Sequence, residues 1–97
     1  MASASATIGQ DVYTLEADTN SATATKATSN LQGTIVNGGS VKVYIATTGT
    51  LATTDAQASG VVGLPSGASI PIPRWIGSFS YKTAASTSVL YWFPDAN

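Results

Sequence analysis

Alternating hydrophobic and polar positions mark short strands along the chain, and no segment shows the period of a helix. Val41, Val43 and Ile45 fall on one side of an extended segment, and Lys42 and Tyr44 fall on the other. A period of two is typical of a strand with one buried face. No apolar stripe persists at positions i, i+3, i+4 and i+7, so we predict no helix.

The segment before this strand predicts a β-hairpin. Residues 31–36 are joined to residues 41–45 by Asn37-Gly38-Gly39. Asn-Gly readily supplies the positive φ angles of a tight hairpin turn, so we expect the two segments to pair. Two further strands, weaker and rich in Thr and Ala, are predicted over residues 12–17 and 22–28.

Prolines define the start of the second half of the chain. The run Leu64-Pro65-Ser66-Gly67 fits a type I turn, with Pro in second place and Gly in fourth. Beyond it, Pro71 and Pro73 are two residues apart, so their missing N–H groups lie on the same side of the strand that contains Ile70 and Ile72. Such a strand can pair fully along one side only, which predicts an edge strand.

The last two predicted strands differ in their faces. Residues 77–82 alternate between an aromatic face and a face of serines and lysine, whereas residues 89–93 are apolar on both faces. A strand apolar on both faces lies either between two layers or under a partner, and near the C-terminus we favour the partner. Short strands with turn signals between them, and no helices, predict an all-β fold: a small antiparallel β-sandwich or barrel.

Composition favours one folded domain with little charge. The chain has 97 residues, of which 9% are charged against about 25% in an ordinary globular protein. Its many β-branched residues and few charges argue against disorder. We expect an extended N-terminal arm over residues 1–10, lying against another subunit, and a single β domain over residues 11–97.

Several kinds of chemistry are excluded by what the sequence lacks. Without Cys or His there can be no disulfide, thiol nucleophile, imidazole base or zinc-thiolate site. A net charge of -1 offers no basic footprint for nucleic acid. No apolar run approaches the roughly 18 residues of a membrane span. The first ten residues lack the basic and apolar regions of a secretory signal, so we expect synthesis in the cytosol.

The sequence offers one candidate pattern for metal binding and one for catalysis, and both are incomplete. Glu16, Asp18 and Asn20 alternate like part of a calcium loop, but Ser21 and Ala27 stand where such a loop needs Gly and a bidentate Glu. Without His, a serine nucleophile would need a lysine base, and the three lysines are interpreted as solvated: Lys26, Lys42 and Lys82. We therefore predict no metal, no cofactor and no enzymatic activity.

Aromatic residues gather in the last quarter of the chain and allow two interpretations. One interpretation is that they form the core. The other is that some of them anchor a protein contact, because Trp, Tyr and Arg dominate interface hot spots. Arg74 directly precedes Trp75, which favours a contact there. The predicted subunit or capsid contacts are Ile8, Arg74, Trp75, Tyr91, Trp92 and Phe93.

A series of hairpin and turn motifs resembles a known group of proteins. The stretches are Ile-Val-Asn-Gly-Gly-Ser at residues 35–40, Val-Tyr-Ile at 43–45, Leu-Pro-Ser-Gly-Ala-Ser at 64–69, an aromatic segment at 75–81 and a Ser/Thr-Val strand at 86–90. With these motifs the chain resembles short, β-rich structural proteins of phage virions. It departs from that group at Ser29–Gly33, where the group has an Arg-Lys-Gly type of entry, and in its Ala/Ser-rich arm.

The resemblance implies a non-enzymatic component of the virion. It points to a capsid decoration, or cement, protein on the outer surface of the head, binding the major capsid protein and assembling as a homotrimer. It implies neither nucleic acid nor a membrane as partner. A tail, neck or fibre component, such as a host-binding adhesin, is the alternative.

Overall fold

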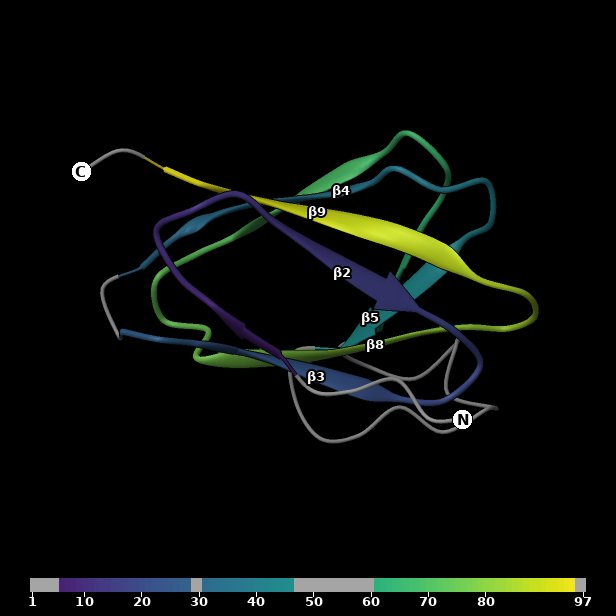
Figure 1. Cartoon of the computed structure of the whole chain (residues 1–97), viewed down its shortest axis with the longest axis horizontal. Coiled ribbons are helices and arrows are strands. Elements are labelled where there is room, and N and C mark those ends of the chain that lie inside the picture. The colour runs from purple at the N-terminus through teal and green to yellow at the C-terminus, as the bar shows by residue number, and fades with distance from the viewer. Residues whose placement is uncertain (1–5, 29–30, 47–60, 96–97) are drawn as a thin grey trace.

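Nine strands in the described residues form two sheets that pack face to face (Figure 1). The computed structural model describes residues 6–28, 31–46 and 61–95. Within these ranges the predicted all-β fold is confirmed, and no helix is present. The strands are β1 (Ala6–Ile8), β2 (Tyr13–Ala17), β3 (Ala22–Lys26), β4 (Gly33–Asn37), β5 (Val43–Ala46), β6 (Val61–Leu64), β7 (Ser69–Ile72), β8 (Ser78–Thr83) and β9 (Ser88–Pro94).

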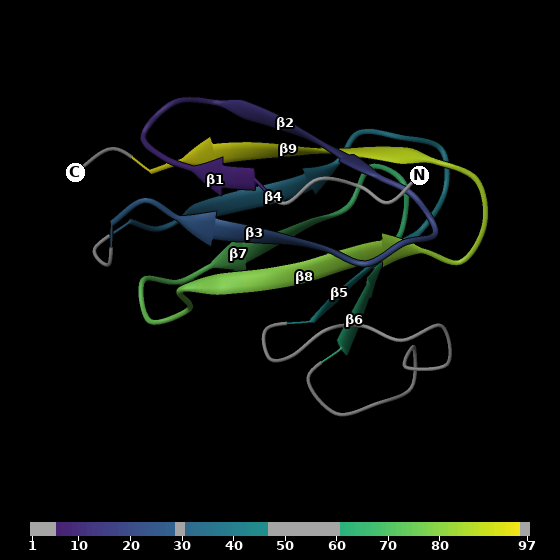
Figure 2. The same ribbon diagram turned by 60° about the horizontal axis from the view of Figure 1, so that its bottom comes forward.

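The two sheets differ in size and in one pairing. Sheet A has the order β1-β3-β8-β5-β6, and sheet B has the order β2-β9-β4-β7 (Figure 2). Every pairing is antiparallel except that of β1 with β3, which is parallel. β1 comes from the segment that the sequence predicts as an arm against another subunit. Ala6–Ile8 instead pairs with β3 of its own chain, and residues 1–5 lie outside the described residues.

The core lies between the sheets and follows the period-two pattern of the strands. On β3, Ala22 and Ala24 stand opposite Tyr81 and Phe79 of β8, so small side chains leave room for two rings whose centroids are 6.1 Å apart. Close packing of large against small side chains fills protein interiors to high density. The largest buried apolar side chains are Ile8, Leu15, Leu31, Ile35, Val43, Ile45, Ile72, Phe79, Tyr81, Leu90 and Trp92.

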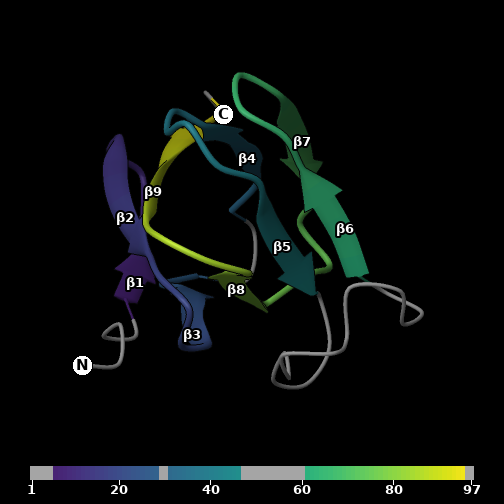
Figure 3. The same cartoon turned by 90° about the vertical axis from the view of Figure 1, so that its right-hand side faces the viewer.

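The predicted hairpin between residues 31–36 and 41–45 is wrong. β4 belongs to sheet B and β5 to sheet A, so the Asn37-Gly38-Gly39 segment carries the chain from one sheet to the other. β6 and β7 make the reverse crossing, while β4 pairs with β7 and β5 with β6. Figure 3 shows the resulting corner along one side of the sandwich. Gly67 is the glycine with positive φ among the described residues, at 80°, so Gly38 and Gly39 are needed for another reason.

Asn37, the last residue of β4, holds this corner together although its side chain is fully buried. Its Nδ2 donates to the carbonyl oxygens of Val41 and Leu64, both at 2.8 Å. Its Oδ1 accepts from the Gly39 N–H at 3.0 Å and from the Ser88 hydroxyl at 2.8 Å. An amide side chain has two N–H donors and two lone pairs on oxygen, so every one of them is used.

Close approach, not backbone conformation, explains the glycines after Asn37. A Cβ on Gly38 would overlap the ring of Tyr91, and a Cβ on Gly39 would overlap the side chain and Cα of Ser88. The Gly38 N–H donates to the carbonyl oxygen of Val89 at 2.9 Å, which ties the crossing segment to β9. The two glycines therefore let the chain turn directly against β9.

The remaining turn and edge predictions had mixed outcomes. The turn lies one residue later than expected: the Ala68 N–H donates to the Pro65 carbonyl, and Gly67, third of the four, has the positive φ of a type II turn. β7 is an edge strand, as its prolines predict. β9 lies between β2 and β4, so it is central in its sheet, and one face of it packs on the core of the same chain.

Replacing Asn37 by Ala should cost about 3 kcal/mol or more of unfolding free energy, because several buried groups lose their partner at once. Urea unfolding measures the loss. Gln32→Ala is the control, since Gln32 bonds Asp95 at an exposed site at 3.3 Å, and should cost under about 0.5 kcal/mol. If Asn37→Ala does not fold, Ser88→Ala removes a single bond and should cost about 1 kcal/mol. Equal losses for Asn37→Ala and Gln32→Ala would contradict the role of Asn37.

Gly39→Ala should destabilise the domain by about 1–3 kcal/mol, because the added methyl group has to displace Ser88. Gly77→Ala is the matched control, since a Cβ there meets no atom within 4 Å. The two melting temperatures give the comparison. A Gly39→Ala variant as stable as Gly77→Ala would contradict the close contact between residue 39 and Ser88.

Candidate functional site

Two of the six predicted contact residues, Ile8 and Trp92, are buried in the chain's own core. Both side chains are 0% exposed. The indole Nε1–H of Trp92 donates to the Gly9 carbonyl at 2.8 Å, so its polar atom is also satisfied inside the domain. Neither side chain offers surface to a partner, and the prediction that they contact a subunit or capsid is corrected. Alternation explains both: Ile8 and Trp92 are on the inner faces of β1 and β9.

The other four lie in two separate places. Arg74 and Trp75 are exposed between β7 and β8, and Trp75 is 82% exposed, more than any other large hydrophobic side chain in the described residues. Tyr91 and Phe93 are on the outer face of β9, where Phe93 is 43% exposed. We call residues 73–77 the Trp75 turn.

The Trp75 turn is held at both ends and in its middle. The Ile76 N–H donates back to the Pro73 carbonyl at 3.1 Å, which closes the turn. The Lys26 Nζ donates to the same Pro73 carbonyl at 2.5 Å, and the Lys26 backbone N–H donates to the Gly77 carbonyl at 2.9 Å. Ile76 packs against the core. The exposed indole is therefore carried by a fixed backbone.

Lys26 is a residue whose role the sequence did not reveal. Its side chain is only 8% exposed, and burial lowers the pKa of its ammonium group. A lysine can lay its aliphatic stem along apolar surface while its charged end finds a polar partner, which here is the Pro73 carbonyl. The interpretation of Lys26 and Lys82 as solvated is wrong, because Lys82 is 6% exposed. Lys42 is exposed, with its Nζ 6.0 Å from the centre of the Tyr44 ring.

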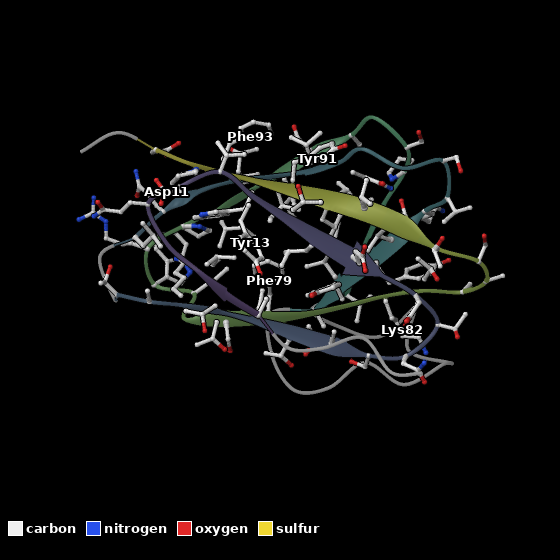
Figure 4. All side chains as sticks on the ribbon, viewed as in Figure 1. Asp11, Tyr13, Phe79, Lys82, Tyr91 and Phe93 are labelled. Carbon is white, nitrogen blue, oxygen red and sulfur yellow. The ribbon has the colours of Figure 1, made fainter. Side chains whose placement is uncertain are left out.

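A second surface is the outer face of sheet B, which we call the β9 face. Val89, Tyr91 and Phe93 run along its middle, with the rings of Tyr91 and Phe93 edge to face at 6.4 Å. In Figure 4 both rings project away from sheet A, whereas Phe79 lies between the sheets. The neighbouring strands add mostly uncharged side chains to the β9 face: Thr14, Glu16, Thr34, Val36, Ser69 and Pro71.

The outer face of sheet A has a different character. On β3 and β8 this face carries hydroxyl groups where β9 carries rings: Thr23 and Thr25 stand opposite Ser80 and Ser78, and Ser80 is buried. The Thr23 and Ser80 hydroxyl oxygens are 3.5 Å apart. The two outer faces of the sandwich therefore differ, and the apolar one belongs to sheet B.

The described residues hold neither a metal-binding cluster of side chains nor a membrane-spanning helix. In residues 6–28, 31–46 and 61–95, no group of three or more His, Cys, Asp or Glu side chains could hold a metal ion. Asp18, part of the calcium-like pattern, accepts the Asn20 N–H at 2.8 Å through its carboxylate and so shapes the turn between β2 and β3. The same ranges contain no helix long and apolar enough to cross a membrane.

No protein-family model matches the sequence, and a search of curated proteins gives no match.

The two tryptophans should respond differently to a soluble quencher. In Trp75→Phe the remaining Trp92 is fully buried, so its emission should be shifted to the blue and resist acrylamide. In Trp92→Phe the remaining Trp75 should be quenched several-fold more strongly, provided that the variant keeps the wild-type circular dichroism spectrum. Similar quenching constants for the two variants would contradict the placement of these side chains.

Proposed function

We propose that this protein is a non-enzymatic component of a phage virion, a capsid decoration protein that binds the major capsid protein through the Trp75 turn. The observation that carries the proposal is the 82% exposure of Trp75 on a turn fixed by Lys26, Pro73 and Gly77. The virion itself is proposed on the resemblance in the hairpin and turn motifs.

The energetics of the Trp75 turn suit a binding anchor. An exposed tryptophan is unfavourable in water, and burying it in a partner's pocket makes it a hot spot worth about 2 kcal/mol or more. Ordering a flexible loop would offset part of that gain. Here the hydrogen bonds of the turn already fix its backbone, so less ordering remains to be done on binding. Arg74, beside Trp75, adds donors for carboxylate or carbonyl groups of the partner.

Low charge suits a protein that packs among many copies of a neighbour. Charged side chains lose favourable hydration when an interface forms. Only 9% of the residues are charged, so coverage by a capsid would desolvate few of them. This composition supports an assembly role but does not distinguish a head protein from a tail protein. A tail, neck or fibre component is therefore the second candidate function.

The test uses heads of the phage that encodes this chain, purified from a deletion strain that lacks it. Wild-type protein should saturate these heads. Trp75→Ala should weaken binding about 30-fold, which corresponds to about 2 kcal/mol. Val62→Ala should bind like wild type, because Val62 is also apolar and exposed, at 42% against 82% for Trp75, but lies on β6.

Quantification of the protein in intact virions separates the candidates. A decoration protein should be present at a copy number comparable with that of the capsid subunits, and a tail or fibre component at far fewer copies. Heads that do not bind the wild-type protein would refute decoration. Equal binding by Trp75→Ala and wild type would refute the role of the turn.

A further inference from the structure

We propose that Asn37-Gly38 is a site of spontaneous deamidation, closed in the folded protein and open to reaction only when the corner between the sheets comes apart. The pair reacts with water, so the modification needs no enzyme. The product cannot rebuild the corner, so a chain that reacts while unfolded does not return to this fold. None of this depends on a virion or on the Trp75 turn.

The corner requires an asparagine and a glycine side by side. Asn37 supplies both the donors and the acceptor that the corner needs inside the core. The ring of Tyr91 occupies the place where a Cβ on Gly38 would lie, so residue 38 has no side chain. A glycine after an asparagine also leaves the backbone nitrogen between them unhindered. The packing that makes Gly38 necessary therefore gives Asn37 the neighbour that reacts most readily with it.

The reaction replaces nitrogen by oxygen on the Asn37 side chain. The Gly38 backbone nitrogen loses its proton to solvent and attacks Cγ of Asn37, forming a new C–N bond that closes a succinimide ring. The side-chain amide nitrogen takes up a proton and leaves as ammonia. Water then opens the ring at either of its carbonyl carbons, which gives aspartate or isoaspartate. Overall, one water is consumed and one ammonia is released for each asparagine converted.

The groups that would react are held in the folded corner. The Gly38 N–H, which must lose its proton, donates to the Val89 carbonyl at 2.9 Å. Nδ2 of Asn37, the leaving group, donates to the carbonyls of Val41 and Leu64, each at 2.8 Å. The Asn37 side chain is 0% exposed, so neither base nor water reaches it. Attack therefore requires the corner to open first, and the rate in the native protein measures that opening.

Neither product fits the place of the amide. An ionised aspartate side chain has no proton to donate, so the carbonyls of Val41 and Leu64 would both lose their donor. Protonation would restore a donor to one of these carbonyls and leave the other unpaired, and buried unpaired groups are costly. Isoaspartate adds one carbon to the main chain before Gly38, where the backbone lies against Tyr91 and bonds to Val89. The modified chain therefore cannot close the corner.

Asn20-Ser21 provides a comparison site in the same chain. It lies between β2 and β3, and the Asn20 side chain is exposed. A serine hinders the backbone nitrogen more than a glycine does, so this pair is the slower of the two in an unfolded chain. Folding closes Asn37-Gly38 but leaves Asn20 in solvent, so it should protect the first site far more than the second.

Incubation of the full chain at mildly alkaline pH, folded in buffer and unfolded in guanidinium chloride, tests this difference. Tandem mass spectrometry of tryptic peptides follows each asparagine. Folding should slow the reaction of Asn37 at least about 100-fold and that of Asn20 at most a few-fold. Ser88→Ala, which removes one hydrogen bond to Asn37, should speed the native reaction about fivefold. Gln32→Ala, which removes an exposed bond elsewhere, is the control and should leave the rate unchanged.

Refolding tests the second half of the proposal. After ageing in denaturant and dilution into buffer, the unmodified fraction should regain the native circular dichroism spectrum and the fraction modified at Asn37 should not. Asn37→Asp should likewise fail to fold or be strongly destabilised, whereas Asn20→Asp should fold like wild type. Equal rates at Asn37 in folded and unfolded chains, or no reaction there in the unfolded chain, would overturn the site. A modified chain or an Asn37→Asp variant as stable as wild type would overturn the claim that the product cannot refold.

Discussion

The buried amide of Asn37 is the constraint on which the rest of this sandwich depends. The chain passes between the sheets twice at one corner, and each passage leaves backbone groups without a partner in either ladder. The Asn37 side chain forms hydrogen bonds at both crossings. It accepts from Gly39 and Ser88 and donates to the carbonyls of Val41 and Leu64. An unpaired buried polar group costs about 1–3 kcal/mol, so no apolar residue of similar size could replace it without leaving several such groups.

The same corner shapes the surface of the protein. Because Asn37 binds Ser88, the first residue of β9, it fixes where that strand begins and hence which of its residues point outward. Gly38 then brings the backbone under Tyr91, and its N–H donates to the Val89 carbonyl. A polar interaction in the core and an apolar stripe outside are thus two consequences of one local structure. The Trp75 turn has its own support, the buried Lys26, at a separate place.

Period-two patterning was sufficient to predict most strands, because burial of one face dictates which residues alternate. It placed Phe79 and Tyr81 together on one face of β8, but Ser80 and Lys82 on the other face are buried as well. The prolines correctly identified β7 as an edge. It failed where three-dimensional contacts decide. Asn-Gly-Gly is a hairpin signal in isolation, yet here a buried asparagine side chain takes the place of a turn. The sequence pattern did not predict β1, which is only three residues long. It also did not predict that Lys26 supports the Trp75 turn, because Lys26 and Pro73 lie far apart in the sequence.

Scarcity of charge has different consequences on the two sheets. On the outer face of sheet A hydroxyl groups take the place of charges, and of these Thr25 is exposed whereas Ser80 is buried, at 3% exposure. Sheet B presents Val89, Tyr91 and Phe93, whose exposure to water is unfavourable. Natural sheet proteins commonly place lysines or inward-pointing charges where association must be prevented. Among the described residues of the β9 face, Glu16 is the one charge, and it stands beside the stripe instead of within it. The sequence thus blocks one edge of sheet B with prolines and leaves its face open to contact.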